Sequence, residues 1–149
     1  MPAHRPPDLG IVDALAQLSF RVQGELGKIA AEHGLSIIQL RLFGILRDRT
    51  PAMLELARYL ELDKSSMTGL VHRAERRGLV QRSPAPHDGR VTQVSLTPQG
   101  LDLVRECEAE VGRRIHALAS VLTGPQRSQL ARLATILVGN PGQDLTPPR

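Results

Sequence analysis

The 149 residues amount to about one domain, and 41% hydrophobic with 23% charged residues is an ordinary globular composition. Aromatic residues make up only 2%, which excludes an aromatic stacking platform for single-stranded nucleic acid, and one cysteine excludes a disulfide framework. No apolar run approaches the ~20 residues of a membrane span, and the first ten residues lack a signal-peptide pattern. We therefore expect a cytoplasmic protein with no membrane partner.

The net charge of +4 is concentrated in one segment. Residues 64–90 carry six basic side chains against two acidic ones, so the rest of the chain is neutral overall. Such a concentration is typical of a phosphate-binding surface, although a merely solvated face would give the same count. The six basic residues are Lys64, Arg73, Arg76, Arg77, Arg82 and Arg90.

Two helices are predicted in the first third of the chain. Apolar residues at steps of three or four predict an amphipathic helix over 11–33, which Gly34 ends. Ser36 and Gln39 form a capping box at the start of a second helix. That helix is apolar on nearly every side up to residue 46, so we expect it in the middle of the core. Residues 47–51 read as a polar break.

A helix-turn-helix pattern follows. Residues 53–60 predict a short helix, and Asp63 is a good N-cap for a fourth helix over 64–77, which Gly78 ends. In this fourth helix the predicted buried stripe consists of Met67, Leu70, Val71 and Ala74. Its opposite face is small, polar and basic.

The second half of the chain predicts a hairpin and two helices. Segments 79–83 and 91–96 favour strands, separated by a turn-rich tip over 84–90. Thr97 and Pro98 start a long helix whose apolar seam is interrupted at Glu108. A last helix follows, with Leu130, Leu133, Ala134 and Leu137 on one side, and residues 141–149 are predicted to be a disordered tail.

These elements predict a mainly α fold with a small β wing, namely a winged helix-turn-helix domain plus a helical dimerisation domain. Small outward residues let the fourth helix enter the major groove, and Ser65 and Ser66 in its first turn suit a phosphate. Arg90, braced by Asp88 and turned by Gly89, is placed to reach the minor groove. The candidate DNA-binding residues are Lys64, Ser65, Ser66, Thr68, Gly69, His72, Arg73, Arg76, Asp88 and Arg90.

The chain resembles the MarR family of transcriptional regulators from about residue 35 to residue 100. The segments that carry the resemblance are 55–60 (ELARYL), 62–71 (LDKSSMTGLV), 75–80 (ERRGLV), 88–90 (DGR) and 94–100 (VSLTPQG). The chain departs from the family at Glu61, where glycine is frequent, and at His72, where an acidic or amide residue is frequent. A left-handed Glu61 would cost about 1–2 kcal/mol, so the turn is expected to differ slightly.

The resemblance implies a homodimer bound to double-stranded DNA at an inverted repeat. It implies an N-terminal dimerisation helix in 1–34, the DNA-binding domain in 35–98 and further dimerisation helices in 99–140. Arg90 would enter the minor groove, with Asp88 as its brace. Family members usually repress promoters and release DNA when a small phenolic or anionic ligand binds between the two domains; Phe20 and Phe43 are the candidate lining residues, with core packing as the alternative.

Several other interpretations remain open. Arg76 or Arg77 could pair with Glu75 or Glu61 instead of contacting DNA. Cys107 is interpreted as a small packed residue of the long helix rather than as a redox switch. No catalytic motif, cofactor motif or metal-ligand spacing is found, so neither an enzyme, nor a cofactor, nor a metal site is expected. A ligand-independent or activating regulator, or a winged helix that binds protein, are the alternatives.

Overall fold

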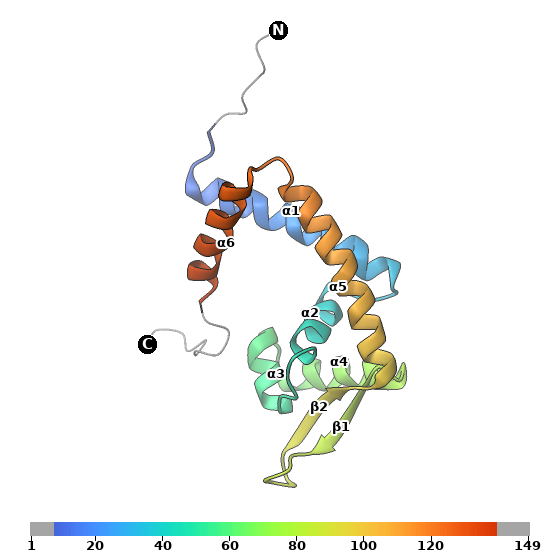
Figure 1. The fold of residues 1–149 in the computed structure, drawn as a ribbon. Coiled ribbons are helices and arrows are strands. Elements are labelled where there is room, and N and C mark those ends of the chain that lie inside the picture. The colour runs from blue at the N-terminus through green and yellow to red at the C-terminus, as the bar shows by residue number, and fades with distance from the viewer. Residues whose placement is uncertain (1–7, 140–149) are drawn as a thin grey trace, which may run out of the picture.

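The computed structural model describes residues 8–139, and this part of the chain is mainly helical with one two-stranded sheet, as predicted (Figure 1). The predicted tail 141–149 lies outside the described residues. The predicted helices and strands are all present, with ends that differ by a residue or two. The elements are α1 (Ile11–Glu32), α2 (Ile37–Leu46), α3 (Met53–Leu60), α4 (Lys64–Arg76), β1 (Val80–Pro84), β2 (Thr92–Leu96), α5 (Pro98–Ala119) and α6 (Gly124–Val138).

Three of the helices end in the same local structure. In each, a leucine amide one residue past a left-handed residue donates to the carbonyl of an alanine five positions earlier, which satisfies an orphan carbonyl of the last turn. The bonds run from Leu35 to Ala30 (2.8 Å), from Leu62 to Ala57 (2.9 Å) and from Leu79 to Ala74 (3.1 Å). The left-handed residues are Gly34 (φ 66°), Glu61 (φ 54°) and Gly78 (φ 72°).

Glu61 therefore adopts the left-handed conformation that its side chain disfavours. The sequence predicted a slightly different turn here, and that prediction is wrong. The turn keeps the glycine-like geometry because Leu62 packs against the core and its amide needs the Ala57 carbonyl. The strain of one backbone angle is small beside these contacts.

The core is aliphatic apart from Phe43 and lies between α2, α3, α4, the sheet and the adjoining ends of α1 and α5. Helix α2 is at its centre, as predicted: its capping box forms, and Gln39, the one buried polar residue in the described chain, belongs to that box. The buried stripe of α4 is also as predicted. The largest fully buried side chains are Phe43, Ile29, Leu42, Leu56, Met67, Leu70, Val71, Val80 and Val94.

The wing is an antiparallel pair whose register runs from Val80 opposite Leu96 to Pro84 opposite Thr92. A short third segment joins it: Ala52 bridges to Gln93, and the Val94 amide donates to the Pro51 carbonyl over 3.0 Å. Pro51, the last residue of the segment predicted as a polar break, thus accepts a hydrogen bond from the edge of the sheet. Edge pairing of two residues leaves no periodic signal in a sequence.

Helices α1 and α5 lie across each other and are joined by an ion-pair cluster around Arg114 (Figure 1). Its guanidinium contacts Glu32 (2.6 Å), Glu110 (2.9 Å) and Glu25 (3.6 Å). The carboxylates raise the pKa of Arg114, and the arginine holds the pKa of Glu110 below its usual value. These ion pairs bridge the two helices where they cross.

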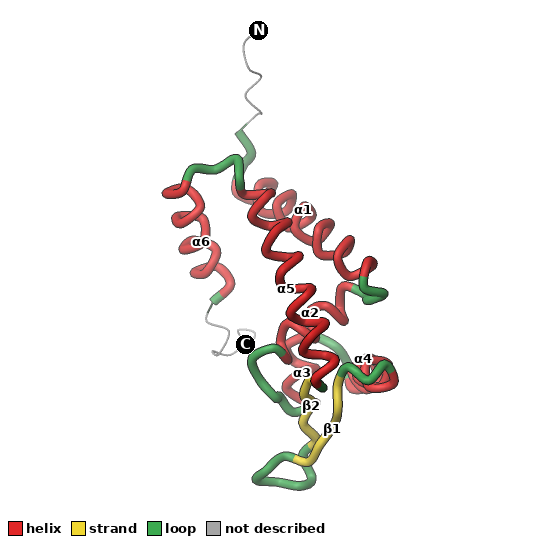
Figure 2. The backbone as a smooth tube through the Cα atoms, turned by 45° about the vertical axis from the view of Figure 1, so that its right-hand side comes forward, coloured by secondary structure: helices red, strands yellow, loops and turns green. Residues whose placement is uncertain are grey.

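Helix α6 packs extensively on no other described element, and none of its residues is buried. In Figure 2 it stands apart from the other helices beyond the turn that follows α5, whereas in Figure 1 its first turns overlap the start of α1 in projection. The first half of α1 is exposed in the same way. Large apolar side chains exposed on the two helices are Ile11, Val12, Leu15, Leu18, Phe20, Leu130, Leu133, Ile136, Leu137 and Val138.

Candidate nucleic-acid interface

Helix α4 lies next to the wing (Figure 2), and its exposed residues form one continuous outward face. Its buried stripe anchors it on the core, so the residues between the stripe positions point away from the protein. The predicted DNA-binding residues of α4 lie on this face. Lys64, Ser65, Ser66, Thr68, His72, Arg73 and Arg76 are exposed, and Gly69 is half-buried.

Asp63 organises the first turn of α4. Its carboxylate accepts from the Ser66 amide (2.7 Å) and from the Ser66 hydroxyl (2.9 Å), and these bonds lower the pKa of Asp63. The Thr68 hydroxyl donates to the Lys64 carbonyl over 2.8 Å. Ser66 and Thr68 therefore hold the helix start with their hydrogens and offer only acceptor lone pairs outward. Within residues 8–139, the Ser65 hydroxyl makes no hydrogen bond and is free to donate.

The middle of α4 combines a position without a side chain, Gly69, with positively charged side chains that form no ion pair in the described residues. A Cβ built on Gly69 would come within 3.3 Å of Arg73 Nη1, so the guanidinium of Arg73 lies back over the glycine. In the described part of the chain, Lys64, Arg73 and Arg76 form no ion pair. Unpaired cations on a helix that presents small residues can meet phosphates while base edges are read.

Two of the six basic residues of segment 64–90 are bound to other groups of the protein rather than free to meet DNA. Arg82 on β1 pairs with Glu75 (2.7 Å), and this raises the pKa of Arg82. Arg77 donates to the backbone carbonyls of Gly34 (3.0 Å) and His33 (3.3 Å) at the end of α1. The suggested pairing of Arg76 or Arg77 with Glu75 or Glu61 is absent from residues 8–139, because both terminal nitrogens of Arg77 donate to the end of α1 instead and Arg76 forms no ion pair there.

The tip of the wing is built as a braced loop. Asp88 Oδ1 accepts from the Arg90 amide (3.1 Å) and from Arg90 Nε (3.2 Å), and the Asp88 carbonyl accepts from the Val91 amide (3.0 Å). Gly89 has no left-handed φ and no neighbour that would meet a Cβ. The Arg90 side chain is 92% exposed. The contact that the sequence predicted between Asp88 and Arg90 is present, with the guanidinium presented to solvent.

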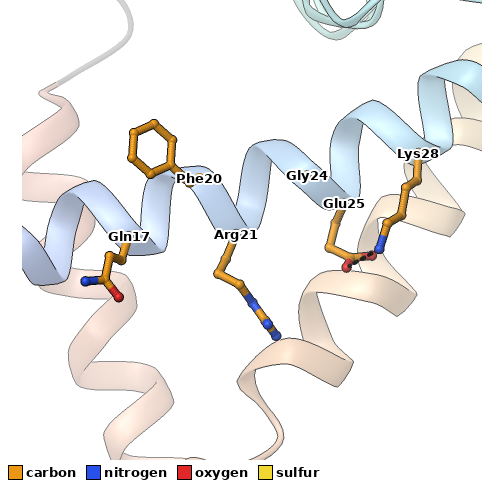
Figure 3. A pocket seen from close by; sticks show the side chains of 6 residues that line it. All are labelled: Gln17, Phe20, Arg21, Gly24, Glu25 and Lys28. Atoms are coloured by element: carbon orange, nitrogen blue, oxygen red, sulfur yellow. Dashed lines mark hydrogen bonds and ion pairs between the residues drawn. The ribbon is translucent and has the colours of Figure 1, made fainter. Parts of the chain in front are cut away.

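The two candidate ligand-lining residues are not brought together. Phe43 is 2% exposed inside the core, which is the packing alternative, whereas Phe20 is 70% exposed on α1. Phe20 borders a shallow surface pocket of about 370 Å³ with Gln17, Arg21, Gly24, Glu25 and Lys28. Figure 3 shows Phe20 directed away from Arg21 and Glu25, on another side of the helix. One helix supplies every lining residue of this pocket.

Other chemistry in the described chain is limited. Cys107 is buried in the core, and burial raises the pKa of its thiol, so it is a packed side chain rather than a reactive thiolate. Residues 8–139 contain no group of three His, Cys, Asp or Glu side chains arranged to hold a metal ion. No single helix among them is long and apolar enough to span a membrane; α1 and α2 are so only as a pair, bent by 89°.

A core-anchored helix with a polar outer face, preceded by a short helix and followed by a hairpin with an exposed arginine, defines a winged helix-turn-helix protein. Residues 33–91 match the sequence model of the MarR family. Over this segment, which contains the helix-turn-helix, the chain is similar to the MarR family of DNA-binding transcription regulators.

Individual relatives agree with this assignment over most of the chain. The homoprotocatechuate degradative operon repressor of Escherichia coli is 29% identical over 90% of this chain and 93% of its own. The structure of NadR in complex with 4-hydroxyphenylacetate is 27% identical, with a TM-score of 0.72 over 92% of this chain and 97% of that chain. A mutant MarR from E. coli complexed with operator DNA shares the fold at 21% identity, with a TM-score of 0.71 over 87% of this chain and 94% of that chain.

Proposed function

We propose that the protein is a dimeric, sequence-specific repressor that binds an inverted repeat in double-stranded DNA and releases it when a small molecule binds. The observation that carries the proposal is the outer face of α4. It combines small residues, a free Ser65 hydroxyl and unpaired cations on a helix held rigidly by its buried stripe. A protein-binding winged helix would need an apolar outer face, which α4 does not have.

A second copy of the chain is the proposed partner of α6 and of the first half of α1. A monomer leaves the apolar side of α6 in water, whereas two copies related by a two-fold axis can cover each other's helices. In this division, residues 1–34 and 99–140 dimerise and residues 35–98 bind DNA. Two-fold symmetry would place two α4 helices in successive major grooves about 34–36 Å apart.

The proposed ligand is a phenolic or anionic small molecule. Supporting this class are two relatives, a repressor named for homoprotocatechuate degradation and a structure in complex with 4-hydroxyphenylacetate. On α1, Arg21 offers a cation and Phe20, on another side of the same helix, an aromatic ring, so a second copy would have to complete a site at either of them. Such a ligand acts only by favouring a dimer shape that fits the operator less well.

The test starts from a duplex selected by the purified protein from a random-sequence library. Fluorescence anisotropy at several salt concentrations then compares wild type with Arg90→Ala and Ser65→Ala, beside a random duplex. We expect tight, salt-sensitive binding to the selected duplex, weakened about 5- to 100-fold by either substitution. Arg105→Ala, which removes an exposed charge from α5, is the control and should bind as wild type does.

Two results would contradict the proposal. Equal, weak binding to selected and random duplexes would show that α4 does not read sequence. Unchanged affinity in both Arg90→Ala and Ser65→Ala, with wild-type stability, would show that DNA lies on another surface. Transcription from a promoter containing the selected site, measured with and without 4-hydroxyphenylacetate, separates a ligand-released repressor from an activator or a ligand-independent regulator.

A further inference from the structure

The C-terminal end of α4 is tied to α1 by a single side chain. Arg77 follows the last residue of α4, and its two terminal nitrogens donate to the carbonyls of Gly34 (3.0 Å) and His33 (3.3 Å). These carbonyls belong to the residues that close α1. The contact joins parts of the chain more than forty positions apart and links the helix that faces DNA to a helix that the proposed dimer contains.

The position suits a guanidinium for an electrostatic reason. Helices α1 and α4 both end here, each at a left-handed glycine, Gly34 or Gly78. The carbonyl end of a helix carries a partial negative charge, so two such ends near each other repel unless a cation lies between them. Arg77 supplies that cation, and its planar fork bonds two carbonyls at once, which a lysine cannot do with the same geometry.

The other side of the same helix end is tied to α5. The Thr97 hydroxyl donates to the Gly78 carbonyl (2.6 Å), and the Thr97 amide donates to the Leu79 carbonyl (3.1 Å). Thr97 is the N-cap of α5, where its hydroxyl also accepts from the Gly100 amide over 3.0 Å. Residues 77–79 are therefore held between the end of α1 and the start of α5. We call these residues the α4 junction.

We propose that Arg77 is a positioning residue, which sets the placement of α4 relative to the dimerisation helices and thereby fixes the half-site spacing that the protein accepts. This inference rests on the proposed function. Arg77 does not contact DNA in this account. Without its bonds to α1, the C-terminal end of α4 is hydrogen-bonded to the dimerisation helices, within the described residues, only through Thr97, while the shared core still packs the DNA-binding unit against the ends of α1 and α5. Each copy of the DNA-binding unit then turns more freely about the start of α5, so the dimer discriminates less between spacings.

The test compares wild type with Arg77→Met, Arg77→Lys and the control Arg105→Met, which removes an equal charge from α5. The probes are the duplex selected by wild type and two derivatives with one base pair added or removed at its centre. For Arg77→Met we expect affinity for the selected duplex to fall about 5- to 20-fold. Affinity for the two derivatives should fall much less. The ratio of the affinity for the selected duplex to the affinity for the derivatives should therefore decrease.

Two further readouts separate positioning from other roles. Because Arg77 makes no phosphate contact, the slope of log affinity against log salt should be the same in Arg77→Met and wild type, whereas a lost phosphate contact lowers it by about one. Arg77→Lys should restore part of the spacing preference, since an ammonium reaches one of the two carbonyls. Thermal melting checks that all variants fold.

The outcomes distinguish this inference from the function on which it rests. If wild type does not prefer its selected duplex to a random one, the proposed function fails before any variant is considered. If wild type is specific and Arg77→Met weakens all three duplexes by the same factor, the positioning role is wrong. A changed salt slope would also overturn it, because Arg77 would then be a DNA contact.

Discussion

At the scale of single residues, Glu61 shows how a packed neighbour dictates a backbone angle. The left-handed conformation at the end of α3 is required because Leu62 must return to the core while its amide reaches the Ala57 carbonyl. The same geometry at the ends of α1 and α4 is met by glycine, which adopts it without strain. The strain at Glu61 is therefore removable by a single substitution.

We expect Glu61→Gly to raise the free energy of unfolding by about 0.5–1 kcal/mol, because the relief of left-handed strain exceeds the added flexibility of glycine in the unfolded chain. Urea denaturation followed by circular dichroism measures the change. Glu61→Ala is the matched control, since it removes the same side chain but keeps a Cβ and so keeps the strain. An equal gain in Glu61→Ala would show that the side chain, and not the backbone angle, is responsible.

Which of the basic side chains in segment 64–90 are free and which are bound within the protein depends on tertiary contacts that the sequence does not show. All six basic residues of segment 64–90 count equally in composition, yet Arg82 is held by Glu75 and Arg77 by α1. The sequence located the positive segment and predicted the face of α4 and the Asp88–Arg90 contact, since both depend on helical period and close neighbours. It could not assign Arg77, because its acceptors are backbone carbonyls far away in the chain.

At the scale of elements, the start of α5 packs so closely against the α4 junction that there is no room for a side chain at Gly100. A Cβ on Gly100 would lie 1.9 Å from the Leu79 carbonyl oxygen, a distance that no side-chain movement relieves because the contacted atom is backbone. The N-cap at Thr97 predicted where α5 begins, and this is confirmed. The need for glycine three residues later has no local cause and is set by the neighbouring chain.

Gly100→Ala should therefore destabilise the protein by more than about 2 kcal/mol, as expected when a well-packed contact must open. Gly44→Ala is the matched control: Gly44 is also helical, and a Cβ there would meet nothing within 4 Å. This control should gain about 0.5–1 kcal/mol from helix propensity. Thermal and urea unfolding of both variants decide the matter; a Gly100→Ala variant as stable as wild type would contradict the close approach.

At the scale of the whole molecule, the described chain has a well-packed part around the core and an exposed part, α6 and the first half of α1, that no other described element covers. The core holds the ends of α1 and α5 against the DNA-binding unit, whereas α6 buries none of its residues. Leu130, Leu133 and Leu137 recur at helical spacing on one side of α6. This stripe is the part of the molecule on which the proposed dimer depends most directly.

We expect Leu133→Asp to shift the protein toward monomer and to weaken binding to the selected duplex more than about tenfold, because the two half-sites are then bound independently. Sedimentation equilibrium gives the oligomeric state, and anisotropy gives the affinity. Ser128→Asp adds the same charge to the opposite side of α6 and should stay dimeric. Unchanged sedimentation of Leu133→Asp would show that α6 does not form the interface.

The sequence by itself determined the order of the elements, the buried stripe of α4, the N-caps of α2, α4 and α5, and the mainly α fold with its wing. These features follow from periodicity and from contacts between close neighbours in the chain. Only the tertiary structure decided that Phe43 lies in the core, that Gly100 meets Leu79 and that Arg77 joins α4 to α1. Each of these depends on which distant segments meet, and that is fixed by the packing of the whole chain rather than by local pattern.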